Sequence, residues 1–536
     1  WVKVMSEHGC IDSTSITIGA TPPPAFALIT PQNTTTQSVP IEQQIAAITN
    51  STTDATNDVA AVTVTGLPEG MTYTWNYPQV SITGASTVIG AHPYTVTATG
   101  NCGTTTTQGT VTVTGERFRM TSLATDSIYI AVQFTGTMYS DWGDGTSDTY
   151  TSGGDWRKHF FAGGALPYTV TGQARTITRL DCNSNQLTTL DVSECAALTD
   201  LACDRNSLSE LDVTKNTELI TLICRDNSLS ELDVTKNTAL TYLSCYNNSL
   251  LALDVEQNTA LTTLQCGNNS LTDLDVTQNT ALTNLHCYSN SLAALDVSKN
   301  TALTRLDCYE NSLSELDVRQ NTKLTTLNCY DNPLGTLDVS ANLALTSLNC
   351  QQNALADLDV TQNTKLTSLY CANNLLTALN ITQNTKLTFL NCGNNPLDTL
   401  DISLHTALTT LNCYGNSLPS LDVTNNTELT TLNCGANLFS TLNVTQNTKL
   451  RTLICSYNQL TSLDVSAHTA LTELRVQTNQ FTAAALNALF GTLHSNPGTK
   501  TIYIANNPRS GSVGSGTSDC DPSIAINNGW TVDTAN

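Results

Sequence analysis

The stretch LTDLACDRNSLSELDVTKNTE, residues 198–218, decides the fold of most of this chain, because the chain repeats it. Its cysteine recurs every 21 residues in fourteen copies, from Cys182 to Cys455, with no insertion or deletion. The shared pattern is L-T-x-L-x-C-x-x-N-x-L-x-x-L-D-V-T-x-N-T-x. A fixed period of roughly 20–29 residues predicts a solenoid, in which each copy forms one coil that packs against its neighbours.

Each repeat carries one short strand signal that ends at its cysteine. In Leu201-Ala202-Cys203, inward and outward positions alternate, which is the periodicity of a strand. Successive coils would stack these strands in parallel at roughly 4.8 Å, with four leucines, a valine and the cysteine of each coil pointing inward. The sequence therefore predicts a mainly β fold of about 15 such coils, with a parallel sheet on the concave face.

The cysteine column is expected to be structural. Cβ atoms of stacked cysteines would lie near the strand spacing, beyond the roughly 3.5–4.5 Å that a disulfide needs. A metal site is the alternative, but the repeats hold no C-x-x-C pair, and a closed core leaves no cavity for an ion. We expect free, buried, unreactive thiols and neither metal nor cofactor. The column comprises Cys182, Cys203, Cys224, Cys245, Cys266, Cys287, Cys308, Cys329, Cys350, Cys371, Cys392, Cys413, Cys434 and Cys455.

An asparagine column accompanies the cysteines. Asparagine offers two donors and an acceptor, so it can pair backbone groups where the chain turns off the strand. Removing one such amide is expected to cost roughly 1–3 kcal/mol of unsatisfied backbone. The column comprises Asn185, Asn206, Asn227, Asn248, Asn269, Asn290, Asn311, Asn332, Asn353, Asn374, Asn395, Asn416, Asn437, Asn458 and Asn479.

A third column is acidic and runs from Asp191 to Asp464, with Asn380 and Asn443 as substitutes. A row of carboxylates suggests calcium, which needs about six or more converging oxygens. The alternative is that each side chain accepts a hydrogen bond from the amide two residues on. We favour this turn-forming role, because asparagine replaces aspartate twice.

Composition limits the partners. The chain has 536 residues and a formal net charge of -23, which argues against nucleic acid and anionic membranes. No apolar run approaches the length of a membrane span, so no membrane insertion is expected. The chain begins at Trp1 without a signal peptide, and we expect a trimmed piece of a larger precursor. Four cysteines lie outside the column and their redox state is open: Cys10, Cys102, Cys195 and Cys520.

The remaining chain divides by motif. Residues 1–24 are expected to end a preceding domain. Residues 25–115 carry Thr- and Val-rich strands, a Leu67-Pro68-Glu69-Gly70 turn and a final T-V-T-V strand, and they resemble the Ig-like β-sandwich modules of bacterial surface proteins. Residues 116–176 contain D-W-G-D-G-T, H-F-F and Y-T-V-T, in an order similar to PKD-type β-domains.

The PKD-like segment is expected to seal the first coil, because the open end of a solenoid needs a cap. Within it, Asp141 and Asp144 are either turn residues, which we favour, or a cation site. Coils are predicted over 177–482. Residues 483–536 are expected to form a C-terminal cap with a short helix at 483–490 and a strand at 530–532.

The array at 177–482 resembles the secreted leucine-rich-repeat proteins of the internalin type, closest to internalin J-like and Bacteroidetes-type proteins with cysteine-containing 21-residue repeats. L-x-x-L-x-C-x-x-N-x-L-x-x-L-D-V, the D-W-G-D-G module and the end from Asp521 to Val532 carry the resemblance. It implies an exported, cell-surface or extracellular, non-enzymatic binding protein, often an adhesin.

The side chains on either side of each cysteine are the candidate ligand-binding residues. Tyrosine offers contact area and a hydroxyl at low entropic cost, although it also simply suits β-strands. The expected partner is a protein or carbohydrate on a host or neighbouring cell. The candidate residues are Tyr246, His286, Tyr288, Asp307, Tyr309, Asn328, Tyr330, Tyr370, Phe389 and Tyr414.

Catalysis is not expected. His286 and Asp307 fall in adjacent coils and could pair, but Ser244 is two coils from His286, and no metal motif or phosphate loop is present. The alternative to a binding protein is a structural subunit of a surface stalk or extracellular filament, with self-association as its mark.

Overall fold

The computed structural model describes residues 27–29, 36–53, 59–100, 103–151, 153, 156–161, 167–507 and 516–534. The chain forms two compact units, Trp1–Leu219 and Ile220–Asn536, which we describe separately. The predicted tail at 1–24, Cys10 and Cys102 lie outside the described residues.

The first part of unit 1 forms two four-stranded sheets, in the orders β1-β3-β6-β5 and β2-β8-β7-β4. Alternating Val and Thr residues put one side of each strand into a shared apolar core that includes Ile48, Ile82 and Val96. The Ig-like assignment remains a prediction. The strands are β1 Ala27–Ile29, β2 Thr36–Pro40, β3 Ile48–Thr53, β4 Val59–Thr65, β5 Met71–Asn76, β6 Gln79–Gly84, β7 Gly90–Gly100 and β8 Gly103–Thr114.

The second part of unit 1 contains a five-stranded sheet in the order β12-β11-β14-β9-β16. A second group is built on β10, which pairs antiparallel with both β13 and β15, while β15 pairs in parallel with β17. The strands are β9 Glu116–Ser122, β10 Ser127–Thr135, β11 Met138–Asp141, β12 Ser147–Tyr150, β13 Trp156–Phe160, β14 Tyr168–Ala174, β15 Thr176–Asp181, β16 Leu187–Asp191 and β17 Asp200–Ala202.

The first predicted coil, at Cys182, differs from the others. Its strand β15 has six residues rather than three, because it pairs antiparallel with β10 on one side and parallel with β17 on the other. Regular coils therefore begin with β17.

The D-W-G-D-G stretch forms a turn over an aromatic core. The amide of Gly143 donates to Asp141 Oδ1 at 2.9 Å, and the amide of Thr146 donates to Asp144 Oδ1 at 3.0 Å. Trp142 is fully buried and stacks on His159, with ring centroids 4.6 Å apart. These contacts give Asp141 and Asp144 a turn-forming role, and the PKD-like assignment remains a prediction.

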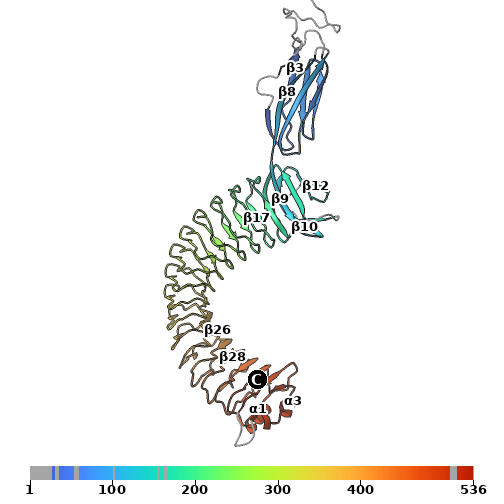
Figure 1. Ribbon diagram of the computed structural model, residues 1–536. Helices are drawn as coiled ribbons and strands as arrows, with labels where there is room; N and C mark the ends of the chain where they lie inside the picture. Colours follow the sequence, from blue (N-terminus) through green and yellow to red (C-terminus); the bar gives the residue numbers. More distant parts are fainter. Residues whose placement is uncertain are drawn as a thin grey trace, which may run out of the picture. The chain divides into compact units, whose positions relative to one another are not determined.

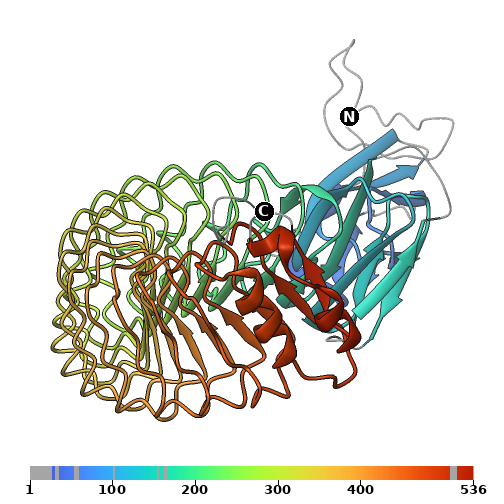
Figure 2. The same ribbon diagram turned by 90° about the horizontal axis from the view of Figure 1, so that it is seen from below.

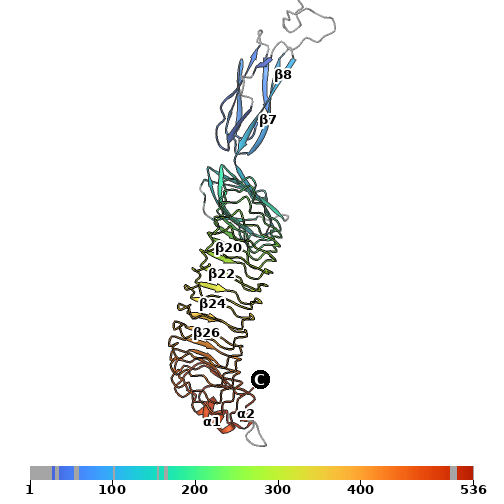
Figure 3. The same cartoon turned by 90° about the vertical axis from the view of Figure 1, so that its left-hand side faces the viewer.

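Unit 2 is a curved stack of coils, and Figure 1 shows its strands on the inner side of the curve. Each three-residue strand pairs in parallel with the next without a shift of register, so that Leu243 lies between Leu222 and Leu264. The strands follow one another like rungs in Figure 3. They are β18 Thr221–Ile223, β19 Tyr242–Ser244, β20 Thr263–Gln265, β21 Asn284–His286, β22 Arg305–Asp307, β23 Thr326–Asn328, β24 Ser347–Asn349, β25 Ser368–Tyr370, β26 Phe389–Asn391, β27 Thr410–Asn412, β28 Thr431–Asn433, β29 Thr452–Ile454 and β30 Glu473–Arg475.

The cysteine ladder is confirmed. Every column cysteine is free and fully buried, and Val476 takes the same buried position in the last regular coil. Burial raises the pKa of Cys245, Cys287 and Cys329 to about 12, which removes the reactive thiolate at neutral pH. Cys195 and Cys520, whose state was open, are also free and buried.

The predicted asparagine column pairs the backbone of adjacent coils. Asn248 Nδ2 donates to the carbonyls of Cys224 at 3.1 Å and Cys245 at 3.0 Å, while its Oδ1 accepts from the amide of Leu229 at 3.0 Å. One side chain thus satisfies three backbone groups in two coils, which locks their spacing.

A second asparagine ladder lies in the V-T-x-N turn and was not predicted. Asn258 is fully buried, and its Nδ2 donates to the carbonyls of Val234 at 2.9 Å and Asn237 at 2.8 Å. His405 and His468 substitute in this ladder and use Nε2 in the same way. The second ladder joins adjacent coils at the V-T-x-N turn.

The acidic column has the predicted turn-forming role. The amide of Thr235 donates to Asp233 Oδ1 at 2.9 Å, and Asn380 accepts from Thr382 at 3.2 Å in the same way. The hydrogen bonds from the Thr235 side chain and amide lower the pKa of Asp233. An amide oxygen serves as well as a carboxylate here, which explains the substitutions.

The C-terminal segment contains the predicted helix, the predicted strand near its end and a further strand, with two short helices that were not predicted. The helix α1, Ala483–Gly491, begins at Thr482, whose side chain accepts from the amide of Ala485. Strand β31, Thr501–Tyr503, pairs in parallel with β30 and with β32, Thr531–Asp533. Helices α2, Gly516–Asp519, and α3, Ser523–Asn527, lie with α1 at the end of the stack (Figure 2).

Candidate binding surface on the strand face of unit 2

Three outward columns of side chains form what we call the strand face of unit 2. In one coil they are Asn284, His286 and Tyr288, which alternate with the buried Leu285 and Cys287. Alternate residues of extended chain point to the same side, so the three columns share one surface. The outward residues differ from coil to coil, whereas the inward ones repeat.

Three consecutive tyrosines form a stacked ridge on this face. The ring centroids of Tyr288 and Tyr309 are 4.7 Å apart with planes 6° from parallel, and those of Tyr309 and Tyr330 are 4.5 Å apart at 10°. The Tyr330 hydroxyl donates to Glu310 Oε1 at 3.0 Å. Burial raises the pKa of Tyr309 to about 12, so its phenol stays protonated at neutral pH.

The other predicted aromatic residues form separate groups. Tyr370 stacks on Phe389 with centroids 4.4 Å apart and planes 29° from parallel. Tyr414 lies against Gly435, and a Cβ on that glycine would stand 3.1 Å from the tyrosine ring. The predicted site residues are therefore distributed along the face in clusters.

His286 and Asp307 are paired as predicted, and Arg305 completes the group. Asp307 Oδ2 lies 2.6 Å from His286 Nδ1 and accepts from Arg305 Nε at 2.8 Å. Burial alone would raise the pKa of Asp307, but the hydrogen bonds from His286 and Arg305 outweigh it and lower that pKa. Asp307 is only 3% exposed, so it orients His286 rather than presenting itself to a partner. The neighbouring Asn328 Oδ1 is also buried.

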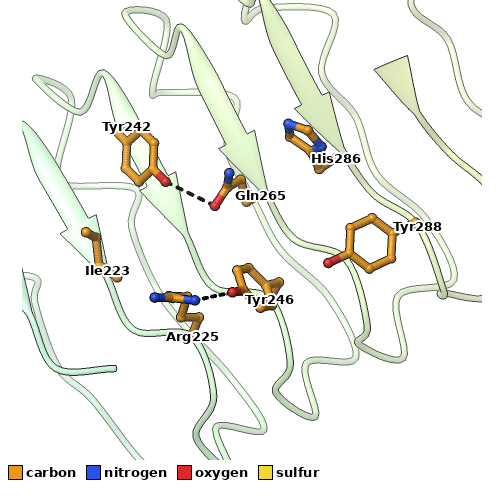
Figure 4. Close-up of a pocket in the computed structure, with 7 residues that line it drawn as sticks. All are labelled: Ile223, Arg225, Tyr242, Tyr246, Gln265, His286 and Tyr288. Atoms are coloured by element: carbon orange, nitrogen blue, oxygen red, sulfur yellow. Dashed lines mark hydrogen bonds between the residues drawn. The ribbon is translucent and has the colours of Figure 1, made fainter. Parts of the chain in front are cut away.

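A pocket of about 450 Å³ opens on the strand face beside the tyrosine ridge. Three of its lining residues were predicted as site residues. Ile223, Arg225 and Gln265 lie in the predicted columns beside the cysteines but were not selected, because the prediction favoured aromatic residues. Tyr242 lies in the outer strand column, which was overlooked. The lining residues are Ile223, Arg225, Tyr242, Tyr246, Gln265, His286 and Tyr288 (Figure 4).

Hydrogen bonds fix the polar groups of this pocket. The hydroxyls of Tyr242 and Ser244 donate to Gln265 Oε1 at 3.0 and 2.9 Å. Arg225 donates through Nη1 to the Tyr246 hydroxyl, and its guanidinium carbon lies 5.3 Å from the centre of that ring. The pocket is thus held in shape by its own contacts.

A second pocket, of about 490 Å³, lies among the turns that carry Asp296, Asp317 and Asp338. Its carboxylates accept turn amides, and Arg319 pairs with Asp317 at 2.6 Å. Across the described ranges, no group of three or more His, Cys, Asp or Glu side chains converges as metal ligands. The described helices are also too short or too polar to cross a membrane.

The coil geometry and its cysteine column define a leucine-rich-repeat solenoid with a cysteine ladder. No family model and no curated protein matches the chain. Among solved structures, the functional domain of InlJ from Listeria monocytogenes, described as including a cysteine ladder, is 39% identical, with a TM-score of 0.58 over 61% of this chain and 74% of that one. The chain belongs to the leucine-rich-repeat family, in the cysteine-ladder form of InlJ.

A second solved structure, the leucine-rich effector protein YopM from Yersinia pestis, is 25% identical. The match covers 57% of this chain and 84% of that one, with a TM-score of 0.46.

Proposed function

We propose that the strand face of unit 2 binds a protein ligand and that the ridge of Tyr288, Tyr309 and Tyr330 is the centre of the interface. The single observation that carries this proposal is the ridge itself: three parallel, half-exposed rings at constant spacing. Stacked rings are already ordered, so a ligand that covers them loses little side-chain entropy. Tyrosine is also among the residues that dominate binding energy at protein interfaces.

Strand propensity is a weaker explanation of these tyrosines. Tyr288 lies two residues beyond His286, the last residue of β21, and Tyr309 and Tyr330 lie equally far beyond their strands. The same column also holds Tyr246 and Tyr414, but in the other coils it holds Gly267, Ala372 and further non-aromatic residues, so the coil does not require an aromatic ring there. The ridge is a local addition to the repeat.

The proposal includes an exported, adhesin-like, non-enzymatic role. The buried ladder tolerates a location outside the cell, because thiols that do not ionise resist oxidation in oxidising surroundings. Protease treatment of intact cells is the test: we expect the chain to be digested without lysis, and protection until lysis would contradict the location.

The binding proposal is tested with the variant Y288A/Y309A/Y330A. Immobilised chain is exposed to surface proteins of candidate partner cells, and bound proteins are identified and titrated. We expect the triple variant to lose about tenfold or more in affinity for the captured ligand. The control is Tyr457→Ala, which removes a tyrosine that is 51% exposed but outside the strand face. Unchanged capture by a folded triple variant would sink the proposal.

A further inference from the structure

One wall of the pocket beside the ridge is the Tyr288 ring, which lies against the backbone of Gly267 in the preceding coil. Gly267 stands between Tyr246 and Tyr288, and a Cβ at Gly267 would lie 2.8 Å from atoms of the Tyr288 ring. The two tyrosines therefore face one another across the glycine, with the Tyr288 hydroxyl directed toward Tyr246 in Figure 4.

The polar groups in the pocket are mainly donors. Gln265 Oε1 already accepts from Tyr242 and Ser244, which turns the amide so that Nε2 offers its hydrogens to a ligand. The Tyr246 hydroxyl accepts from Arg225, so its own proton is directed elsewhere. Burial raises the pKa of Tyr288, which therefore also remains a donor at neutral pH.

The charged residues around the pocket also favour a ligand that is rich in hydrogen-bond acceptors. Arg225 is the cation among its lining residues, and none of those residues is acidic. Asp226, 3.8 Å from Arg225 Nη1, lies outside the lining. Asp307 lies behind His286 and also accepts from Arg305. In a chain of net charge -23, this pocket is a site that favours a small anion with several acceptor atoms.

We propose that this pocket receives the carboxylate of a Glu or Asp side chain on the protein ligand. Arg225 supplies the charge, and Gln265, Tyr246 and Tyr288 supply hydrogen bonds. The inference rests on the proposed function, because Tyr288 belongs to both the ridge and the pocket wall, so one ligand segment lying along the ridge reaches both. His286, held through Nδ1 by Asp307, is a fixed wall of the pocket.

The test uses the full chain labelled with 15N in its arginines and three small probes. They are N-acetylglutamic acid α-methylamide, its glutamine counterpart, and the methyl glycoside of glucuronic acid, which carries the same carboxylate on a sugar. The Arg225 Nε signal is assigned by its loss in Arg225→Gln. We expect the glutamate probe to shift this signal and the other two to bind about tenfold more weakly or not at all.

Two variants test whether the glutamate probe binds in this pocket, and a third variant is the control. Arg225→Gln should weaken binding of the glutamate probe about tenfold or more. Gly267→Ala should weaken it with the charge intact, because the methyl group displaces the Tyr288 ring. Arg319→Gln, an exposed arginine paired with Asp317 elsewhere, should have no effect. Circular dichroism confirms that each variant is folded.

Three outcomes would each overturn the inference. The glutamate and glutamine probes could bind equally well, the sugar acid could bind more tightly than the glutamate probe, or Arg225→Gln could leave the affinity for the glutamate probe unchanged. The probes need no protein ligand, so this failure is distinct from failure of the proposed function. If the glutamate probe does not bind while the tyrosine triple variant still captures less protein ligand, only the proposal of a carboxylate pocket is refuted. If the probes bind while the triple variant, which also lacks the Tyr288 wall of the pocket, captures normally, then the ridge is not the interface and the protein ligand does not place a carboxylate in this pocket.

Discussion

Each coil of unit 2 has an inner side that hardly varies and a strand face that varies freely. Inside, the cysteine, the leucines and two asparagines recur with the same contacts in coil after coil. Outside, the column after the cysteine changes from arginine to tyrosine to glycine within Arg225, Tyr246 and Gly267. The stacked backbone imposes identical demands on every inner position and almost none on the outer ones. Residues that repeat in every coil of this chain are therefore structural, and residues that differ between coils are the candidates for function.

Of the changes considered, alkaline pH should cause the largest loss of folding stability, because it ionises the buried thiols of the inner side. Burial raises the pKa of Cys245, Cys287 and Cys329 to about 12, while an unfolded thiol titrates near about 8.5. Thiol burial therefore contributes its full stability below the unfolded value, and that stability is lost as pH rises toward the folded one. Each thiol costs about 1.4 kcal/mol per pH unit in this window. We expect cooperative loss of the circular dichroism signal between about pH 9 and 12.

The matched control replaces Cys266, Cys287 and Cys308 by valine, the residue that Val476 shows to fit the same buried position. This variant should unfold at a higher pH than the wild-type chain. An alkaline midpoint that does not move would show that other groups, such as tyrosines, govern the transition.

Asn248→Ala should produce the next largest effect on the inner side. It leaves the Leu229 amide without its side-chain partner, whereas the Cys224 carbonyl keeps a hydrogen bond from Asn227 Nδ2 at 3.1 Å. We expect a loss of about 1–3 kcal/mol, the cost of one unsatisfied buried backbone group. Hydrogen exchange of the Leu229 amide reports the loss locally. Protection equal to that of the wild-type chain would contradict the ladder's role.

Tyr309→Ala should cost less in stability than Asn248→Ala. The ring stacks on Tyr288 and on Tyr330, and each aromatic pair contributes about 0.5–1.5 kcal/mol. We expect a loss of about 1–2 kcal/mol in chemical denaturation. A loss as large as that of Asn248→Ala would mean that the ridge is a structural part of the coil and not an addition to it.

His405→Asn should have the smallest effect. His405 donates through Nε2 to the carbonyl of Ile381 at 3.1 Å, in a position where other coils use asparagine. Restoring asparagine should change stability by less than about 0.5 kcal/mol, because it exchanges one buried donor for another. A thermal melt compares the two chains, and a shift of several degrees would show that this coil has adapted specifically to histidine.

The regular part of the fold could be predicted because every copy of the repeat confirms the others. The 21-residue spacing gave the register, and the register placed the cysteines inside and the aspartates in turns. The second asparagine ladder, from Asn216 to Asn447, was equally visible as a column. It was overlooked because only the aspartate that precedes the V-T-x-N motif was considered when this turn was interpreted. Cys195 occupies the same column, which explains an otherwise isolated cysteine.

The pocket could not be predicted from the columns alone. It depends on the hydrogen bond between Tyr242 and Gln265 of the next coil and on the Tyr288 ring lying against Gly267. Side-chain conformation across three coils decides such contacts, and column membership does not specify it. The burial of Asp307 was missed for a similar reason: its position is outward by alternation, yet His286 and Arg305 cover it.

The most direct test of the central claim, that the strand face holds the ligand, is photo-crosslinking from two positions. A benzophenone amino acid replaces Tyr309 on the ridge in one chain and Leu251 in another, a residue that is 67% exposed outside the strand face. Both chains are mixed with the captured ligand and irradiated. We expect a covalent adduct from position 309 and none from position 251. An adduct from position 251 alone, or equal yields from both, would contradict it.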